Sequence, residues 1–197
     1  MPSTALIGWR AERANRLDEL FAAHRRVGGP GAGRRTDTQQ INWALVLRLS
    51  GEFQGFVRDL HSVGAELFAQ WTAPHDPRLA TLVENLLTQG LTLDRGNPTP
   101  GAIGEAFNRF GLSWWPALTR RDRRTAARQA QLTRLNRARN AIAHARPGEL
   151  GPLRAEGYPL TLDTVRVWRQ AVGGLATTMD MELSDHVATF FGQPRPW

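Results

Sequence analysis

Apolar residues recur at intervals of three and four along most of the chain, which is the spacing of one face of a helix. The longest such stripe is Ile41, Leu45, Leu49, Phe53, Phe56, Leu60, Val63 and Leu67. The same spacing predicts helices at residues 5–27, 37–71, 79–91, 102–110, 121–145 and 162–191. No segment alternates apolar and polar residues as a half-buried strand would. We therefore predict an all-α bundle of about five to six helices, mostly antiparallel, without a significant sheet.

Glycine and proline mark the breaks between the predicted helices. A glycine-rich run predicts a flexible loop over residues 28–38, and Asp37 or Thr38 is the expected N-cap of the helix that follows. At the other end, residues 192–197 form a short proline-containing tail. A chain of 197 residues fits one domain, so we expect residues 1–197 to form a single helical domain.

Arginine supplies the positive charge of the chain, because the sequence contains no lysine. The formal net charge is +7, and all 25 basic residues are arginine. Abundant Arg, Ala, Gly and Pro together are what codon bias in a GC-rich genome produces. Whatever its origin, a surface rich in guanidinium groups attracts RNA or DNA, because these groups match phosphate oxygens and carry a permanent charge. An acidic protein partner could use the same field.

Composition also restricts the class of protein. There are no cysteines, so disulfides and thiolate metal sites are excluded. The apolar run at the N-terminus is too short for a signal peptide, and no stretch approaches the ~20 apolar residues that span a bilayer. We expect a soluble cytoplasmic protein that has no membrane partner.

The most informative stretch is Arg-Asn-Ala-Ile-Ala-His at residues 139–144, near the end of the helix predicted at 121–145. Asn140 and His144 are four residues apart, so a helix places them on one face. Histidine can transfer protons near neutral pH, and arginine can bind phosphate oxygens with two hydrogen bonds. These side chains together suit the handling of a phosphodiester.

Two arginines compete for the role beside His144. On an ideal helix, Arg137 lies within about 60° of both Asn140 and His144, whereas Arg139 falls on the apolar side. Arg139 would reach the polar face if the helix bends or its long stem curls round. If Arg139 instead faces another helix, its charge requires an acidic partner, and Glu52 is the first candidate, ahead of Asp59.

The pattern Arg-Asn-x-x-x-His on a late helix of a small all-helical protein resembles the signature of the HEPN superfamily (higher eukaryotes and prokaryotes nucleotide-binding). Residues 45–60 also resemble the early helix of stand-alone bacterial members. The resemblance implies a metal-independent endoribonuclease without a cofactor, acting as a toxin or phage-defence effector. It further implies a homodimer in which two motif helices meet, and an antitoxin or defence-system partner protein.

The resemblance also assigns roles to residues. His144 would act as general base or acid on a ribose 2′-hydroxyl that attacks its own 3′-phosphate, leaving a 2′,3′-cyclic phosphate. Asn140 would orient the imidazole or the phosphate, and Arg139 or Arg137 would stabilise charge in the transition state. The resemblance favours Arg139, because it directly precedes the asparagine. Both arginines fit the looser spacing of the family.

Further arginines in the same segment are candidates for RNA binding. They are Arg120, Arg121, Arg123, Arg124, Arg128 and Arg134. Cations at the start of a helix oppose its dipole, so helix stability does not explain the first five, and contacts with phosphate would. A solvated charged face is the other interpretation. If the motif is not catalytic, the chain is a helical module that binds RNA, nucleotide or protein and dimerises.

Overall fold

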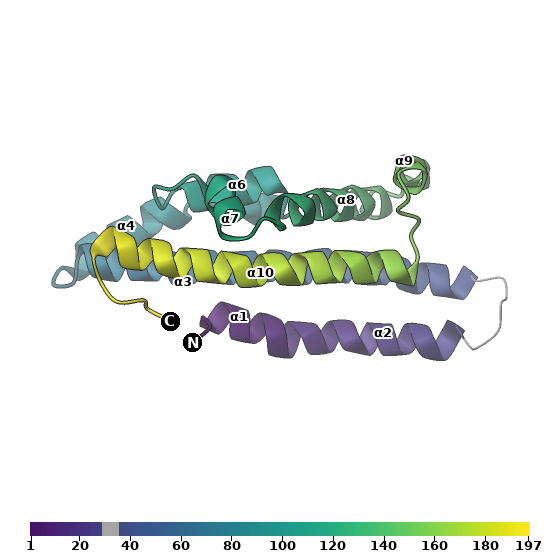
Figure 1. Ribbon diagram of the computed structural model, residues 1–197, viewed down its shortest axis with the longest axis horizontal. Helices are drawn as coiled ribbons and strands as arrows, with labels where there is room; N and C mark the ends of the chain where they lie inside the picture. The colour runs from purple at the N-terminus through teal and green to yellow at the C-terminus, as the bar shows by residue number, and fades with distance from the viewer. Residues whose placement is uncertain (29–35) are drawn as a thin grey trace.

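Two long helices form the axis of the molecule in the computed structural model, which describes residues 1–28 and 36–197. Helices α3 (Thr36–Thr72) and α10 (Leu162–Phe191) lie side by side and run in the same direction, while α8 (Thr125–Ala143) packs on both in the opposite direction (Figure 1). The described part is 80% helical and contains no strand, which confirms the all-α prediction. None of its helices combines the length and the apolar character needed to cross a membrane.

The N-terminal segment forms a nearly continuous rod that packs on α3. It comprises α1 (Thr4–Gly8), a π-helical turn η1 (Trp9–Arg13) and α2 (Ala14–Gly28). The Ser3 hydroxyl accepts a hydrogen bond from the Leu6 amide and so caps α1. Trp9 packs its indole against the rings of Phe53 and Phe56, with centroids 5.9 and 5.7 Å apart. The stripe predicted for residues 5–27 therefore faces the core.

Helix α3 buries the stripe that the sequence predicts for it. Leu45, Leu49, Phe53, Phe56 and Leu60 have no exposed surface. The helix begins at Thr36, inside the loop predicted at residues 28–38, and the rest of that loop lies outside the described residues apart from Gly28.

The prediction of five to six helices is too low, because segments that read as turns contain short helices. Trp114 illustrates the reason: it is fully buried and stacks on Phe107, with ring centroids 4.2 Å apart. Such helices are stabilised by tertiary packing more than by local propensity. The shorter elements are α4 (Pro77–Thr88), α5 (Thr92–Arg95), α6 (Pro100–Asn108), α7 (Trp114–Arg121), the 3₁₀ turn η2 (Pro147–Glu149) and α9 (Leu150–Ala155).

The last helix has the predicted bounds, and the tail after it folds back. The Thr161 hydroxyl accepts a hydrogen bond from the Thr164 amide at the start of α10. At the other end, the Trp197 indole donates to the Asp180 carbonyl at 3.3 Å, and the Ser184 hydroxyl donates to the Trp197 carbonyl at 3.0 Å. Residues 192–197 are therefore held along α10.

A histidine is enclosed between α3 and α6. His61 is 1% exposed, and its Nε2 lies 3.2 Å from the Ala106 carbonyl oxygen. Its ring packs against Phe107 and Phe110, with centroids 5.4 and 4.8 Å away. Burial lowers the pKa of His61 from 6.5 to about 4, because the charged imidazolium would lose its hydration.

This pKa makes the stability of the fold dependent on pH. As the pH falls from 6.5 towards 4, unfolded His61 binds a proton that folded His61 does not, so the free energy of unfolding decreases. Between pH 7 and pH 5 the loss is about 2 kcal/mol. We predict that His61→Gln, which keeps a donor for the Ala106 carbonyl, removes about this much of the pH dependence in urea unfolding. An unchanged pH dependence in the variant would contradict the prediction.

Candidate functional site

The motif lies where α8 ends. His144 is the C-cap of the helix, and Ala145 follows with φ of 51°, in the left-handed region. The Arg146 amide donates to the Ala141 carbonyl at 2.8 Å and the Ala145 amide to the Ile142 carbonyl at 3.1 Å. These two bonds form a Schellman motif, in which glycine usually takes the position of Ala145. The chain thus turns sharply away directly after His144.

Asn140 is held by a residue from the connection between α5 and α6. The Asn97 side-chain amide donates to Asn140 Oδ1. One turn earlier, the buried Asn136 donates to the Pro98 carbonyl at 3.0 Å. Two asparagines of α8 therefore bind the Asn97–Pro98 segment, and this fixes the orientation of the Asn140 amide.

The structure separates the two candidate arginines. The Arg137 guanidinium forms an ion pair with Glu156 at 2.7 Å. The Arg139 guanidinium donates to Asn140 Oδ1 at 3.4 Å. Neither arginine bonds to the His144 ring in the described part of the chain. Arg139 is thus the arginine in contact with the motif asparagine.

Arg139 is unusual among the half-buried arginines. Each of the others outside residues 29–35 bonds to a carboxylate or to backbone carbonyls: Arg13, Arg58, Arg109, Arg121, Arg128, Arg134 and Arg169. Among the described residues, Arg139 bonds only to the neutral amide oxygen of Asn140. Its positive charge is therefore not neutralised by a bonded acid, which leaves it able to bind an anion.

His144 is exposed, and its ring forms no hydrogen bond or ion pair with residues 1–28 or 36–197. Its backbone amide closes the last turn of α8 by donating to the Asn140 carbonyl at 3.0 Å. Asn140 and His144 are thus linked by one helical turn, with the imidazole open to solvent.

The expected pairing of Arg139 with Glu52 is wrong. Glu52 is 4% exposed and binds Arg13 at 2.8 Å, Arg48 at 2.6 Å and Arg16 at 3.4 Å. Burial acts to raise the pKa of Glu52, but hydrogen bonds and the charges of these arginines lower it below its ordinary value. The N-terminal rod places its arginines against this face of α3, so Glu52 joins the rod to α3 instead of supporting the motif.

The second acidic candidate also bonds elsewhere. Asp59 pairs with Arg13 at 2.7 Å. Arg13 therefore bridges Asp59 and Glu52, and neither acid bonds to Arg139.

The basic segment does not form one helix start. Arg120 and Arg121 lie in the last turn of α7, where cations are favoured by the dipole, and Asp122 separates them from α8. The dipole argument from the sequence is therefore wrong for these two residues. Arg120, Arg123 and Arg124 are exposed, and their side chains form no ion pair within the described ranges.

The other three candidates for RNA binding are engaged within the fold. Arg121 pairs with Glu182 at 2.5 Å and also with Asp185. Arg128 pairs with Asp122 at 2.6 Å. Arg134 lies over the Tyr158 ring at 4.4 Å from its centroid and contacts Glu156. These contacts join α7, α8 and α10 to their neighbours.

Three groups of a candidate phosphodiester site lie within the last six residues of α8 and its cap. Arg139 supplies a charge, Asn140 an oriented amide and His144 an exposed imidazole. Sequence reasoning missed Asn97 and Asn136; a mid-helix asparagine one turn before Asn140 was the available signal, since asparagine is disfavoured inside helices. In the part of the chain that the structure describes, no three His, Asp or Glu side chains gather as a metal site.

No family model, curated protein or solved structure matches this chain. The resemblance to the HEPN superfamily therefore depends on residues 139–144 and residues 45–60.

The bond between Asn97 and Asn140 predicts an energetic coupling between them. We expect Asn97→Ala and Asn140→Ala each to lower the free energy of unfolding by about 1 kcal/mol, and the double variant to lose less than the sum. A coupling of about 1 kcal/mol is expected in denaturant unfolding. Asn85→Ala is the control, because Asn85 is exposed on α4, and its coupling to Asn140 should be zero. Additive losses at positions 97 and 140 would disprove the contact.

Proposed function

We propose that this protein is a metal-independent endoribonuclease of the HEPN type. The observation that supports the proposal best is Arg139, a half-buried arginine with no bonded acid among the described residues, five residues before the exposed His144 at the end of α8. Fixing an unneutralised charge in this way costs stability, and binding of a phosphate would offset that cost. The open imidazole is then within the same short segment as the bound phosphate.

The proposed reaction uses the ribose of the substrate as the nucleophile. His144 takes the proton from the 2′-hydroxyl, and the 2′-oxygen forms a bond to the adjacent phosphorus. The bond from phosphorus to the 5′-oxygen breaks, and that oxygen receives a proton. The products carry a 2′,3′-cyclic phosphate and a 5′-hydroxyl. Arg139 stabilises the charge that develops on the phosphoryl oxygens, and Asn140 positions the phosphate or the imidazole.

A second copy of the chain supplies the other half of the site in this proposal. One reaction needs a base for the 2′-hydroxyl and an acid for the 5′-oxygen, and each chain offers one His144. An exposed His144 at a helix end suits an isologous dimer in which two α8 helices meet. A role as a toxin or phage-defence effector, restrained by an antitoxin or another partner protein in the cytoplasm, belongs to the same proposal.

The proposal predicts a large loss of activity in one variant. We expect His144→Ala to lower RNA cleavage at least about 100-fold while the fold persists, because general acid–base groups contribute that much or more. Cleavage by the wild type should be unchanged in EDTA. His75→Ala is the matched control, since His75 is exposed in the loop before α4, and it should retain full activity.

Residual activity in His144→Ala close to the wild-type rate would refute the catalytic role of this residue. RNA that is bound but left intact by the wild type would favour the alternative, a non-catalytic helical module that binds RNA, nucleotide or protein and dimerises. Gel analysis of labelled RNA separates these outcomes, with circular dichroism as the check on folding.

A further inference from the structure

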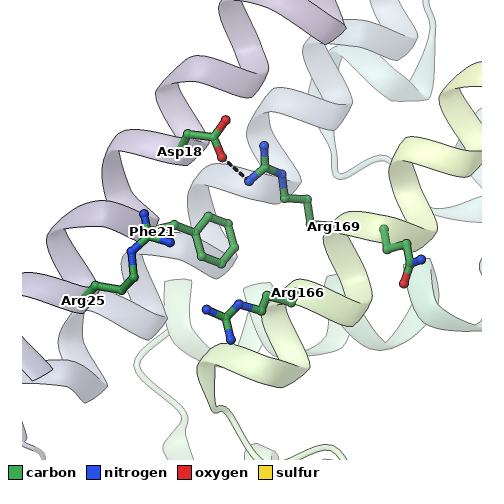
Figure 2. Close-up of a pocket in the computed structure, with 6 residues that line it drawn as sticks. Asp18, Phe21, Arg25, Arg166 and Arg169 are labelled. Atoms are coloured by element: carbon green, nitrogen blue, oxygen red, sulfur yellow. Dashed lines mark hydrogen bonds and ion pairs between the residues drawn. The ribbon is translucent and has the colours of Figure 1, made fainter. Parts of the chain in front are cut away.

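A cleft lined by arginine lies between α2 and α10, and none of its lining residues belongs to the motif. It has a volume of about 410 Å³ and is lined by Asp18, Phe21, Arg25, Arg166, Arg169 and Gln170. Figure 2 shows the three guanidinium groups around the Phe21 ring, with Arg25 coming from α2 and the other two from α10. Helix α2 packs mainly on α3, which leaves room for these side chains between α2 and α10.

The acids near the cleft do not balance its charge. Arg169 pairs with Asp18 at 2.5 Å, and this hydrogen bond lowers the pKa of the Asp18 carboxyl. Arg166 pairs with Asp163 at 2.8 Å, but Asp163 is 85% exposed, so solvent weakens that pair. Arg25 forms no ion pair within the described residues. Three cations thus face one another with one well-placed acid.

The helix dipole accounts for one of these three arginines. Arg25, in the last turn of α2, is placed favourably for it. Arg166 and Arg169 lie beyond the first turn of α10, where the dipole has little effect, so it does not explain them. Repulsion among the three guanidinium groups costs stability, and a bound anion would relieve it.

The geometry favours a phosphate over a base as the group that is bound. The Arg169 guanidinium lies over the Phe21 ring, 5.2 Å from its centroid, and Phe21 is 6% exposed. A base therefore has no free aromatic face on which to stack. The remaining polar groups at the mouth are the guanidinium groups of Arg25 and Arg166, whose donors match phosphate oxygens.

A second groove lies next to the cleft, between α10 and α8. That groove has a volume of about 290 Å³, and Arg124 and Arg128 line it together with Gln131. Gln170 lines both hollows. Cations on both sides of α10 suit an extended polyanion better than a single phosphate ion.

We propose that the α2–α10 cleft binds a backbone phosphate of RNA through Arg25 and Arg166, with the strand continuing over Gln170 towards Arg124. This inference takes its ligand from the proposed function. Arg169 is held by Asp18 and Phe21 and shapes the floor of the cleft. The cleft thus extends substrate binding to a surface that is distinct from residues 139–144.

The test uses an RNA that the proposed reaction cannot cut. A fluorescent, fully 2′-O-methylated single strand is titrated with the wild type and with Arg25→Gln/Arg166→Gln at several salt concentrations. Loss of two phosphate contacts should reduce the slope of log Kd against log salt by about 1.4 and weaken binding at least about tenfold at low salt. The matched control is Arg78→Gln/Arg95→Gln, which removes two exposed arginines of α4 and α5 and should change binding less than about twofold.

Equal weakening of RNA binding in the two double variants would overturn the proposal. It would show that the net positive charge of the protein attracts RNA and that the cleft is not a local site. Wild-type binding that is absent, or whose Kd does not depend on salt concentration, would overturn it as well. So would displacement of the RNA by millimolar inorganic phosphate when log Kd shows no slope against log salt. Cleavage of unmodified RNA is measured in parallel. If the wild type cleaves RNA and the cleft variant binds RNA as tightly as the wild type, the cleft proposal alone is rejected. If the cleft variant binds more weakly but the wild type does not cleave RNA, the cleft proposal is supported and the ribonuclease proposal is rejected.

Discussion

Burial of α3 is the constraint on which the rest of the structure depends. The N-terminal rod, α4, α6, α8 and α10 all pack on this one helix. The middle of its apolar face, from Leu45 to Leu60, is completely covered, and at about 25 cal/mol per Å² such a surface supplies much of the driving force for the fold. The exception is Glu52, a carboxylate inside the contact region. Its three arginine partners offset the cost of burying it, and two of them, Arg13 and Arg16, tie the N-terminal rod to α3.

The ion pairs between the packed helices distinguish arginines that bond to an acid within the fold from arginines that do not. Several acids at the helix contacts bond to arginines such as Arg121 and Arg128, which join neighbouring helices. Arg139 and Arg25 have no bonded acid in the described part of the chain. They come from different elements and open onto different surfaces. In the two proposals an anionic partner offsets these unpaired charges, and one single-stranded RNA contacts both arginines.

The sequence predicted what depends on long periodic stripes. The α3 stripe and the bounds of α10 follow from local spacing and from the Thr161 cap, so both could be read without knowledge of the fold. The short helix α7 could not, because it depends on Trp114 stacking against Phe107. Local patterns carry no information on which distant ring is available.

The candidate site shows the same limit. Helical geometry grouped Arg137 with His144, but Glu156, beyond the end of α8, pairs with Arg137. Glu52 was assigned to Arg139 because both were expected at one helix contact, whereas the N-terminal rod supplies the arginines that bind it. Asn97 lies 43 residues before Asn140, and only the packing of the α5–α6 connection on α8 brings them together. Residue types were predictable from the motif, but their partners were not.

The chemistry of the RNA ends tests the central claim most directly. A defined RNA is incubated with the protein in EDTA, and the termini are analysed by phosphatase sensitivity and mass spectrometry. We expect a 2′,3′-cyclic phosphate on one fragment and a 5′-hydroxyl on the other, and no cleavage where the ribose at the scissile position carries a 2′-O-methyl group. Fragments with a 3′-hydroxyl and a 5′-phosphate, or cleavage of the methylated RNA, would contradict the 2′-hydroxyl mechanism.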